Sequence, residues 1–260
     1  MTFLATEQTD QAGDWPAALR QVFAEPWRVR PAFQPILDLE RKDVWGFQVL
    51  ARFISPLRAT PPEWLEAAGR AGVRQALETR LLEAGLQALP DVPERCLLLL
   101  PVSATTLLDE GVQKALARHV TAMRQVVLDI ADDGDAVELD ELIDAVAPLR
   151  GDGGRIAVAA GASPGGLDGL PRLRPDLLKV GRDFVAGLDS DAAQRAVVEG
   201  LVQLVSALGG RILAVGVEGP AQLESLAAVG ITLGQGFGLG RPVPSMAASV
   251  TRAGTSLLNA

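Results

Sequence analysis

The chain has 260 residues, of which 48% are hydrophobic, and a formal net charge of −8. This length is enough for one large hydrophobic core, and an acidic chain without a long basic run is a poor partner for a nucleic-acid polymer, whose backbone needs clustered Lys and Arg. Cys96 is the only cysteine and His119 the only histidine, so one chain cannot assemble a disulfide or a Cys/His zinc cluster.

The sequence also lacks the signals of membrane insertion and export. No segment reaches the roughly 18 apolar residues of a membrane span. The first ten residues lack the basic region and apolar core of a signal peptide. We therefore expect a cytoplasmic protein.

The first predicted elements are a short helix and a pair of strands. Asp14 can cap free backbone N–H groups and Pro16 is tolerated in a first turn, so a helix is expected from here to about Ala24. Residues 32–39 and 44–53 are apolar-rich runs separated by four charged residues. This spacing is typical of a turn between antiparallel strands.

Helices and apolar runs alternate along the rest of the chain. Thr60 and Glu63 form a capping-box pattern that predicts a helix start, and a second helix is expected at residues 74–89. The later predicted strands are residues 96–102, 126–131, 156–160, 177–180, 212–217 and 231–235. The later predicted helices are residues 111–120, 138–148, 191–208, 220–229 and 245–258.

This alternation predicts the fold class. Continuous apolar strands are buried on both faces, which favours a mostly parallel sheet covered by helices, and about eight such strands indicate a TIM-like (β/α)8 barrel. An open doubly wound sheet is the alternative, but no G-x-G-x-x-G follows a strand. We expect an N-terminal extension with a short helix at residues 1–30 and a barrel domain at residues 31–260.

A series of short motifs resembles one known family. The segments are FQPI (33–36), GFQVLARF (46–53), IAVAA (156–160), LLKVGRDFV (177–185), AVGVE (214–218) and QGFGLGRP (235–242). In this order and spacing they resemble the EAL-domain phosphodiesterases of bacterial cyclic di-GMP signalling. The resemblance implies a barrel with an antiparallel first strand.

The resemblance also shows where this chain departs from the family. Active members hold two divalent cations with carboxylates and one amide, and the metals activate the water that opens the cyclic phosphodiester. The positions that match these metal-ligand and catalytic residues are Gln48, Pro101, Asp129, Ala159, Ala160, Gly181 and Val215. Only Asp129 is a carboxylate, and one acid beside a lysine cannot offset four positive charges. We expect no metal, no cofactor and no phosphodiesterase activity.

Other matched positions are those of the family's ligand contacts and of residues beside them: Leu50, Arg52, Lys179, Glu218, Gln235, Phe237 and Pro242. Arg52 can bind a phosphate without metal, or make a local salt bridge. Lys179 needs a partner if it is buried, either Asp129 or Glu218, or else contacts phosphate. Leu50, Phe237 and Pro242 suit a barrel core or rim equally well.

Two segments near the predicted strand ends carry further expectations. Residues 159–166 lack the family's loop that helps form the active dimer, and Asp132, at the place of the acid that tethers this loop, is expected to be solvated. Residues 161–165 match G-x-S-x-G, but Pro164 has no N–H for an oxyanion hole and His119 precedes Ser163, so a serine hydrolase is disfavoured.

The resulting hypothesis is an inactive EAL-like domain that acts as a regulatory module by binding a partner protein. A metal-independent cyclic di-GMP receptor is the alternative, and an active phosphodiesterase the third possibility. A homodimer is open. Trp15, Trp27 or Trp64 would mark an interaction face if exposed, although such aromatic residues more often belong to the core.

Overall fold

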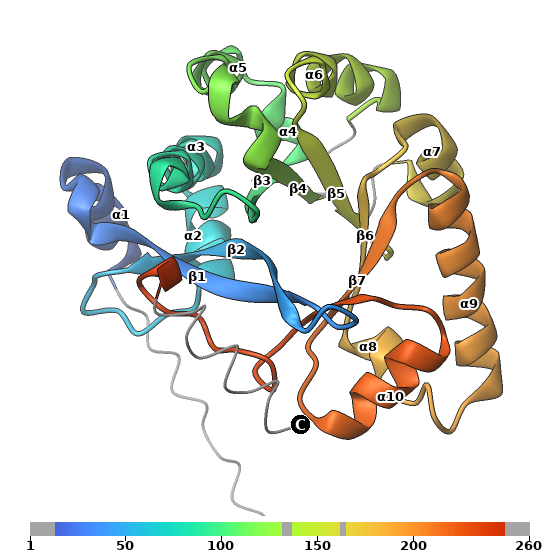
Figure 1. Ribbon diagram of the computed structural model, residues 1–260. Helices are drawn as coiled ribbons and strands as arrows, with labels where there is room; N and C mark the ends of the chain where they lie inside the picture. Colours follow the sequence, from blue (N-terminus) through green and yellow to red (C-terminus); the bar gives the residue numbers. More distant parts are fainter. Residues whose placement is uncertain (1–13, 132–136, 162–164, 248–260) are drawn as a thin grey trace, which may run out of the picture.

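The computed structural model describes residues 14–131, 137–161 and 165–247. In this part of the chain, strands β1 to β8 form a closed barrel in sequence order (Figure 1). The strands are β1 (Val29–Asp38), β2 (Asp43–Phe53), β3 (Leu97–Ser103), β4 (Val126–Ala131), β5 (Arg155–Ala159), β6 (Leu177–Val180), β7 (Arg211–Val215) and β8 (Leu233–Gln235). Strand β1 is antiparallel to both β2 and β8, and the other neighbours are parallel. The predicted EAL-type barrel is confirmed.

Helices surround the barrel on its outside (Figure 1). The α-helices are α1 (Trp15–Ala24), α2 (Pro61–Arg70), α3 (Arg74–Leu86), α4 (Ala104–Leu107), α5 (Glu110–Ala117), α6 (Leu139–Gly151), α7 (Gly166–Leu173), α8 (Arg182–Val185), α9 (Ala192–Ala207) and α10 (Pro220–Ala228). Short 3-10 turns are η1 (Pro26–Arg28), η2 (Leu89–Asp91) and η3 (Val120–Gln125). Of the helix predicted at residues 245–258, only residues 245–247 are described; Met246 and Ala247 are helical and Ser245 is not.

Helix α7 was not predicted from the sequence. It contains Pro171 and starts beside Gly165 and Gly166, which both have positive φ. Pro and Gly are the weakest helix formers, so the local signal for a helix is poor. Burial of Leu170 and Leu173 against the barrel stabilises the helix instead.

Most residues of the strands are apolar because both faces of the strands are buried. One cluster fills the barrel interior: Ile36, Leu99, Val127, Ala157, Leu177, Leu213 and Leu233. A second and larger cluster lies between the strands and the surrounding helices. Residues of opposite parity along each strand therefore enter different cores, which explains the continuous hydrophobic runs.

The segment before the barrel is packed against it. Leu19 and Val22 of α1 are buried in one cluster with the fully buried Trp64 of α2. The Trp64 ring stacks on Phe53 with 4.4 Å between ring centroids and meets Trp15 edge-on at 5.2 Å. Trp15 and Trp64 thus belong to this core. The domain boundary at residue 30 stays a prediction.

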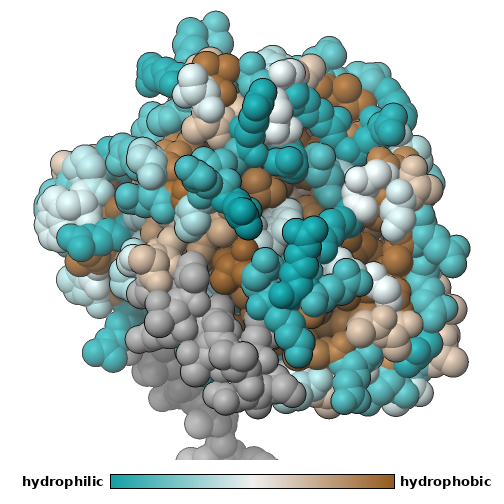
Figure 2. Space-filling view, viewed as in Figure 1, coloured by the Kyte–Doolittle hydropathy of each residue, from teal (hydrophilic) through white to brown (hydrophobic). Residues whose placement is uncertain are grey.

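The surface of the described part of the protein carries few large apolar side chains. Figure 2 shows a mostly hydrophilic surface with hydrophobic residues in the hollows between polar ones. The exposed large hydrophobic residues of the described ranges are Trp27, Ile54, Val120, Leu167, Val197 and Phe237. No helix within those ranges is long and apolar enough to cross a lipid bilayer.

Cys96 lies directly before β3 and has a structural role. It is buried, and its thiol lies 3.5 Å from the Val44 carbonyl oxygen. Burial raises the pKa of the Cys96 thiol, and the negative charge of Asp43 adds to this effect. A thiol held in its protonated form is a poor nucleophile.

An ion pair between the buried Asp38 and the partly exposed Arg211 lies at the end of the barrel opposite to the carboxyl ends of the parallel strands. Asp38, at the end of β1, accepts from Arg211 Nη2 at 2.9 Å and from the Arg41 backbone N–H at 3.1 Å. Burial alone would raise the pKa of Asp38, but the hydrogen bonds from Arg41 and Arg211 outweigh it, and the pKa is lowered.

We expect Asp38→Asn to lower the free energy of unfolding by about 2 kcal/mol at pH 7, because the buried Asp38 side chain loses its charged hydrogen bond with Arg211. Since the folded-state pKa of Asp38 is lowered, its contribution is complete above the unfolded pKa of about 3.9 and disappears as the pH falls through the folded value. Urea denaturation between pH 7 and pH 3 measures this. The exposed Asp144→Asn is the control, and equal pH profiles for wild type and Asp38→Asn would contradict the prediction.

Candidate functional site

The carboxyl ends of the even-numbered strands carry a layer of polar side chains above the apolar interior. Gln48 of β2, Asp129 of β4, Lys179 of β6 and Gln235 of β8 meet here, joined by Gln34 of β1. Alternate strands contribute the side chains of one layer in a barrel of this kind, so four residues far apart in sequence share one level. This layer is the candidate functional site.

The members of the layer form a continuous chain of hydrogen bonds. Lys179 Nζ lies 2.6 Å from Asp129 Oδ2, and Gln48 Nε2 donates to the same oxygen at 3.0 Å. Gln235 Nε2 donates to Gln48 Oε1 at 2.8 Å and to Gln34 Oε1 at 3.2 Å. Gln34 Nε2 donates to the Gly240 carbonyl oxygen at 3.0 Å.

The two ends of this chain determine how every amide is oriented. The Asp129 carboxylate only accepts, so Gln48 must turn its NH2 group toward it, and Gln48 Oε1 must then accept from Gln235. The Gly240 carbonyl imposes the same direction on Gln34. Gln235 therefore donates both of its protons, and its Oε1 is buried without a hydrogen-bond partner among the described residues.

The donor set does not fit two divalent cations. Mg²⁺ and Mn²⁺ need several oxygen ligands, preferably anionic. The layer offers one carboxylate, Asp129, and its Oδ2 is already bonded to the Lys179 ammonium and the Gln48 amide. No group of three or more His, Cys, Asp or Glu side chains is placed to hold a metal within residues 14–131, 137–161 and 165–247.

The other positions predicted to have lost metal ligands also lie at strand ends. Pro101 of β3 is exposed and pairs in register with Asp129. Ala159 and Ala160 at the end of β5 are half-buried, as is Val215 at the end of β7. Gly181 is extended at φ −76° and precedes α8. None of these five side chains can ligate a cation.

Lys179 has one of the two partners predicted for it. Its ammonium pairs with Asp129, and both side chains are largely buried. Glu218 instead forms an ion pair with Arg182 at the rim. Arg182 was not predicted from the sequence to be a site residue. Its position directly after Gly181, at the end of β6, was the available signal.

Arg52 lies at the rim on the end of β2. It is exposed, and its Nη1 donates to the Ala51 carbonyl oxygen at 3.3 Å. Leu50, two residues earlier on the same face of β2, is half-buried. The local salt bridge predicted as one possibility for Arg52 is not among the ion pairs of the described residues.

The segment after β8 places an aromatic ring at the mouth. Phe237 is 58% exposed, and the Arg241 guanidinium lies 4.8 Å from its ring centroid, while Pro242 is half-buried. Gly236 is required at its position, because an added Cβ would collide with the backbone of Val217. The need for a glycine at this position therefore has a steric basis.

A small pocket of about 190 Å³ opens at the mouth between the ends of β7 and β8. Its lining residues are Gln34, Arg182, Val215, Gly216, Glu218, Gln235, Gly236 and Phe237. The sequence shows Gln34 only as part of the FQPI motif (33–36), whereas its hydrogen bonds place it in the polar layer. The structure thus adds Gln34 and Arg182 to the predicted site.

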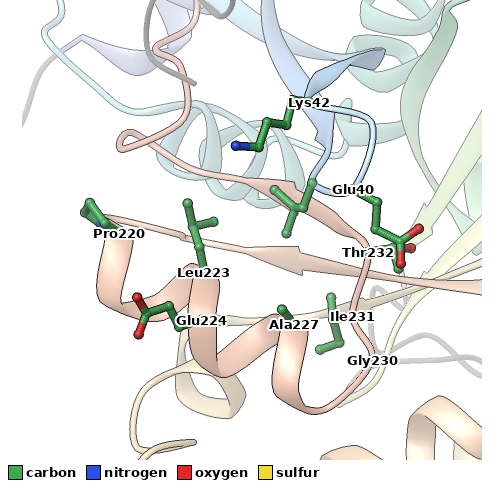
Figure 3. Close-up of a pocket in the computed structure, with 10 residues that line it drawn as sticks. Glu40, Lys42, Pro220, Leu223, Glu224, Ala227, Gly230, Ile231 and Thr232 are labelled. Carbon is green, nitrogen blue, oxygen red and sulfur yellow. The ribbon is translucent and has the colours of Figure 1, made fainter. Parts of the chain in front are cut away.

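A larger pocket of about 420 Å³ lies away from this layer, between the β1–β2 turn and α10. Figure 3 shows Glu40 and Lys42 on one side and Pro220, Leu223 and Glu224 on the other. Its wall also includes the apolar residues Leu39, Ala227 and Ile231. No residue of this pocket was predicted to be functional.

Two expectations fall on residues that the structure does not describe. Asp132 lies in the range 132–136, and Ser163 and Pro164 lie in the range 162–164. The predicted solvation of Asp132 and the predicted absence of a nucleophilic serine site both stay predictions. Ala160 at the edge of this segment donates its N–H to the Lys179 carbonyl oxygen at 2.8 Å.

Proteins named as enzymes of cyclic di-GMP turnover are among the relatives of this chain. The bifunctional diguanylate cyclase/cyclic di-GMP phosphodiesterase MucR of Pseudomonas aeruginosa is 32% identical over 137 residues, which cover 52% of this chain and 20% of MucR. The cyclic di-GMP phosphodiesterase NbdA of the same organism is 26% identical over 223 residues, covering 82% of this chain and 28% of NbdA. The chain thus spans less than a third of the length of either relative.

Solved structures show the same fold. The PaMucR phosphodiesterase in complex with c-di-GMP superposes with a TM-score of 0.75 at 26% identity, covering 90% of this chain and 99% of that one. The Xanthomonas citri FimX EAL domain superposes with a TM-score of 0.76 at 15% identity, covering 89% and 94%. The family model of the EAL domain matches residues 17–242. This chain therefore belongs to the EAL domain family.

Proposed function

We propose that this protein is a catalytically inactive EAL domain that acts as a regulatory module in cyclic di-GMP signalling by binding a partner protein. The observation that carries the proposal is the bonding of Lys179 and Gln48 to Asp129 at the barrel mouth. A lysine ammonium and a neutral amide already satisfy the one carboxylate that a metal would need. Two-metal activation of a water is therefore not available to these residues.

The charges of the site explain why a pair of divalent cations would bind poorly. Two divalent cations bring four positive charges, whereas Asp129 and Lys179 together have no net charge. Burying uncompensated cations costs many kcal/mol, so a metal pair would have to displace Lys179 and still lack anionic ligands. The neutral side chains at positions 48, 159, 160 and 215 offer no replacement.

An interaction role is supported by apolar groups at the rim of the barrel. Trp27 is 51% exposed, and Ile54 is exposed as well. The Ile54 N–H donates to the carbonyl oxygen of Arg28, the residue after Trp27, at 2.7 Å. Exposed aromatic and branched residues of this kind are frequent anchors of protein interfaces. Of the three tryptophans predicted to mark a face if exposed, Trp27 alone meets that condition.

A turnover assay tests the loss of catalysis. We expect no hydrolysis of cyclic di-GMP above background with Mg²⁺ or with Mn²⁺. The variant Gln48→Glu/Ala159→Asp/Ala160→Asp/Val215→Glu should also lack activity, since Pro101 still occupies an amide-ligand position. The MucR phosphodiesterase, assayed in parallel, is the positive control. Turnover by the wild-type protein would refute the proposal, and turnover by the variant alone would show that the acids are sufficient.

A metal-independent cyclic di-GMP receptor is the second candidate. The mouth pocket and the unpartnered Gln235 Oε1, which can accept a ligand N–H, favour it, and PaMucR is described in complex with this nucleotide. Isothermal titration in EDTA and then in Mg²⁺ distinguishes the candidates. Equal saturable binding in both buffers would support the receptor, and no heat in either would leave the protein-binding module.

A further inference from the structure

Two arginines face each other across the first two strands of the barrel. Strands β1 and β2 pair Gln34 with Gln48, Ala32 with Leu50, and Arg30 with Arg52. Residues two apart on a strand lie on the same face. Because Gln34 and Gln48 point into the barrel toward Gln235, Arg30 and Arg52 lie on the same inner face, about 13 Å farther toward the mouth.

The outer face of β1 confirms this assignment of faces. Val29 and Phe33 belong to apolar clusters, and Val29, Pro31 and Phe33 share a groove with Arg80 of α3. The residues of odd number thus pack outward. Arg30, of even number, is exposed at the rim together with Arg52.

This juxtaposition of like charges has no counterion in the described part of the chain. Arg28, Arg182 and Arg211 each pair with a carboxylate. By contrast, Arg30 Nε donates to the Trp27 carbonyl oxygen at 3.4 Å and Arg52 Nη1 to the Ala51 carbonyl oxygen at 3.3 Å. Like charges directly opposite each other destabilise a strand pair. In a chain of net charge −8, two adjacent guanidinium groups without a carboxylate partner among the described residues form a local positive site that can attract an anion.

We propose that Arg30 joins Arg52, whose position matches a ligand contact of the family, so that the two guanidinium groups together bind one phosphate group of a ligand at the barrel mouth. A guanidinium offers parallel N–H donors that match two phosphate oxygens, and two guanidinium groups can hold one phosphate between them. Because this site lacks the ligands for divalent cations, Arg30 would supply the positive charge that such cations would otherwise bring to the phosphate. The inference deepens the receptor candidate and rests on it for cyclic di-GMP as the physiological source of the phosphate.

Thermal unfolding with inorganic phosphate tests the anion site without assuming the nucleotide. Phosphate should raise the wild-type Tm above that in KCl of equal ionic strength, and Arg30→Gln and Arg52→Gln should each abolish this rise. Arg118→Gln, a change at an exposed arginine of another face, should keep it. Without phosphate, Arg30→Gln should be at least as stable as the wild type, because the repulsion is removed.

Titration with cyclic di-GMP in EDTA tests the physiological source. Loss of charged hydrogen bonds should weaken binding about tenfold or more in Arg30→Gln. Phosphate stabilisation that requires both arginines, without cyclic di-GMP binding, would retain the anion site and refute the receptor. A wild-type protein insensitive to phosphate, or an Arg30→Gln variant that responds as the wild type does, would overturn the role of Arg30.

Discussion

Replacing Lys179 by Met should lower the free energy of unfolding by about 3 kcal/mol or more. The apolar stem keeps its packing, but the largely buried Asp129 loses the ammonium 2.6 Å away. Among the described residues, the Gln48 amide is then the remaining side-chain donor to the carboxylate. Chemical denaturation followed by circular dichroism measures the change.

Two further variants isolate the cause of this loss. Lys114→Met removes an exposed ion pair with Glu110 and should cost less than about 0.5 kcal/mol. Asp129→Asn/Lys179→Met removes both buried charges and should recover much of the stability lost in Lys179→Met, since no unpaired ion remains. If the double variant were less stable than Lys179→Met, the uncompensated carboxylate would not be the cause.

Restoring the family's glutamate, Gln48→Glu, should also destabilise this protein, by about 2 kcal/mol at pH 7. The NH2 group that donates to Asp129 at 3.0 Å would become a second carboxylate at the same distance. One Lys179 ammonium cannot compensate both acids. In this barrel the residue typical of active relatives is therefore expected to be unfavourable.

The pH dependence identifies the mechanism. At lower pH the two carboxyl groups can share a proton, so the penalty of Gln48→Glu should shrink between pH 7 and pH 5. Gln48→Met loses the hydrogen bonds without adding charge, and its penalty should stay constant over that range. A Gln48→Glu variant as stable as the wild type at pH 7 would mean that Lys179 balances both carboxylates.

Most of the fold could be predicted because most helices and strands have a local signal in the sequence. The uninterrupted apolar run at residues 126–131 becomes β4, and the Thr60–Glu63 capping box starts α2. Helix α7 could not be predicted, since Gly and Pro hide its helical signal and tertiary burial stabilises it. The 3-10 turns and the four-residue helices α4 and α8 are also too short for a periodicity to appear.

The site was predictable only in part. Motif spacing identifies Gln48, Asp129, Lys179 and Gln235 as strand-end residues. Their residue types show that Asp129 is the one acid among the four. Which of these side chains bond to one another depends on strand register and on closure of the barrel. Gln34 illustrates this, because it enters the layer through a hydrogen bond to Gln235, 201 residues away in sequence.

The sequence by itself determined the alternation of strands and helices and the barrel class, since these depend on residue type and local periodicity. Only the tertiary structure decided that Asp129 rather than Glu218 neutralises Lys179, and that Arg30 stands opposite Arg52. The physical reason is that hydrogen bonds and ion pairs act over a few ångströms. Such distances between residues far apart in the chain exist only once the barrel has closed.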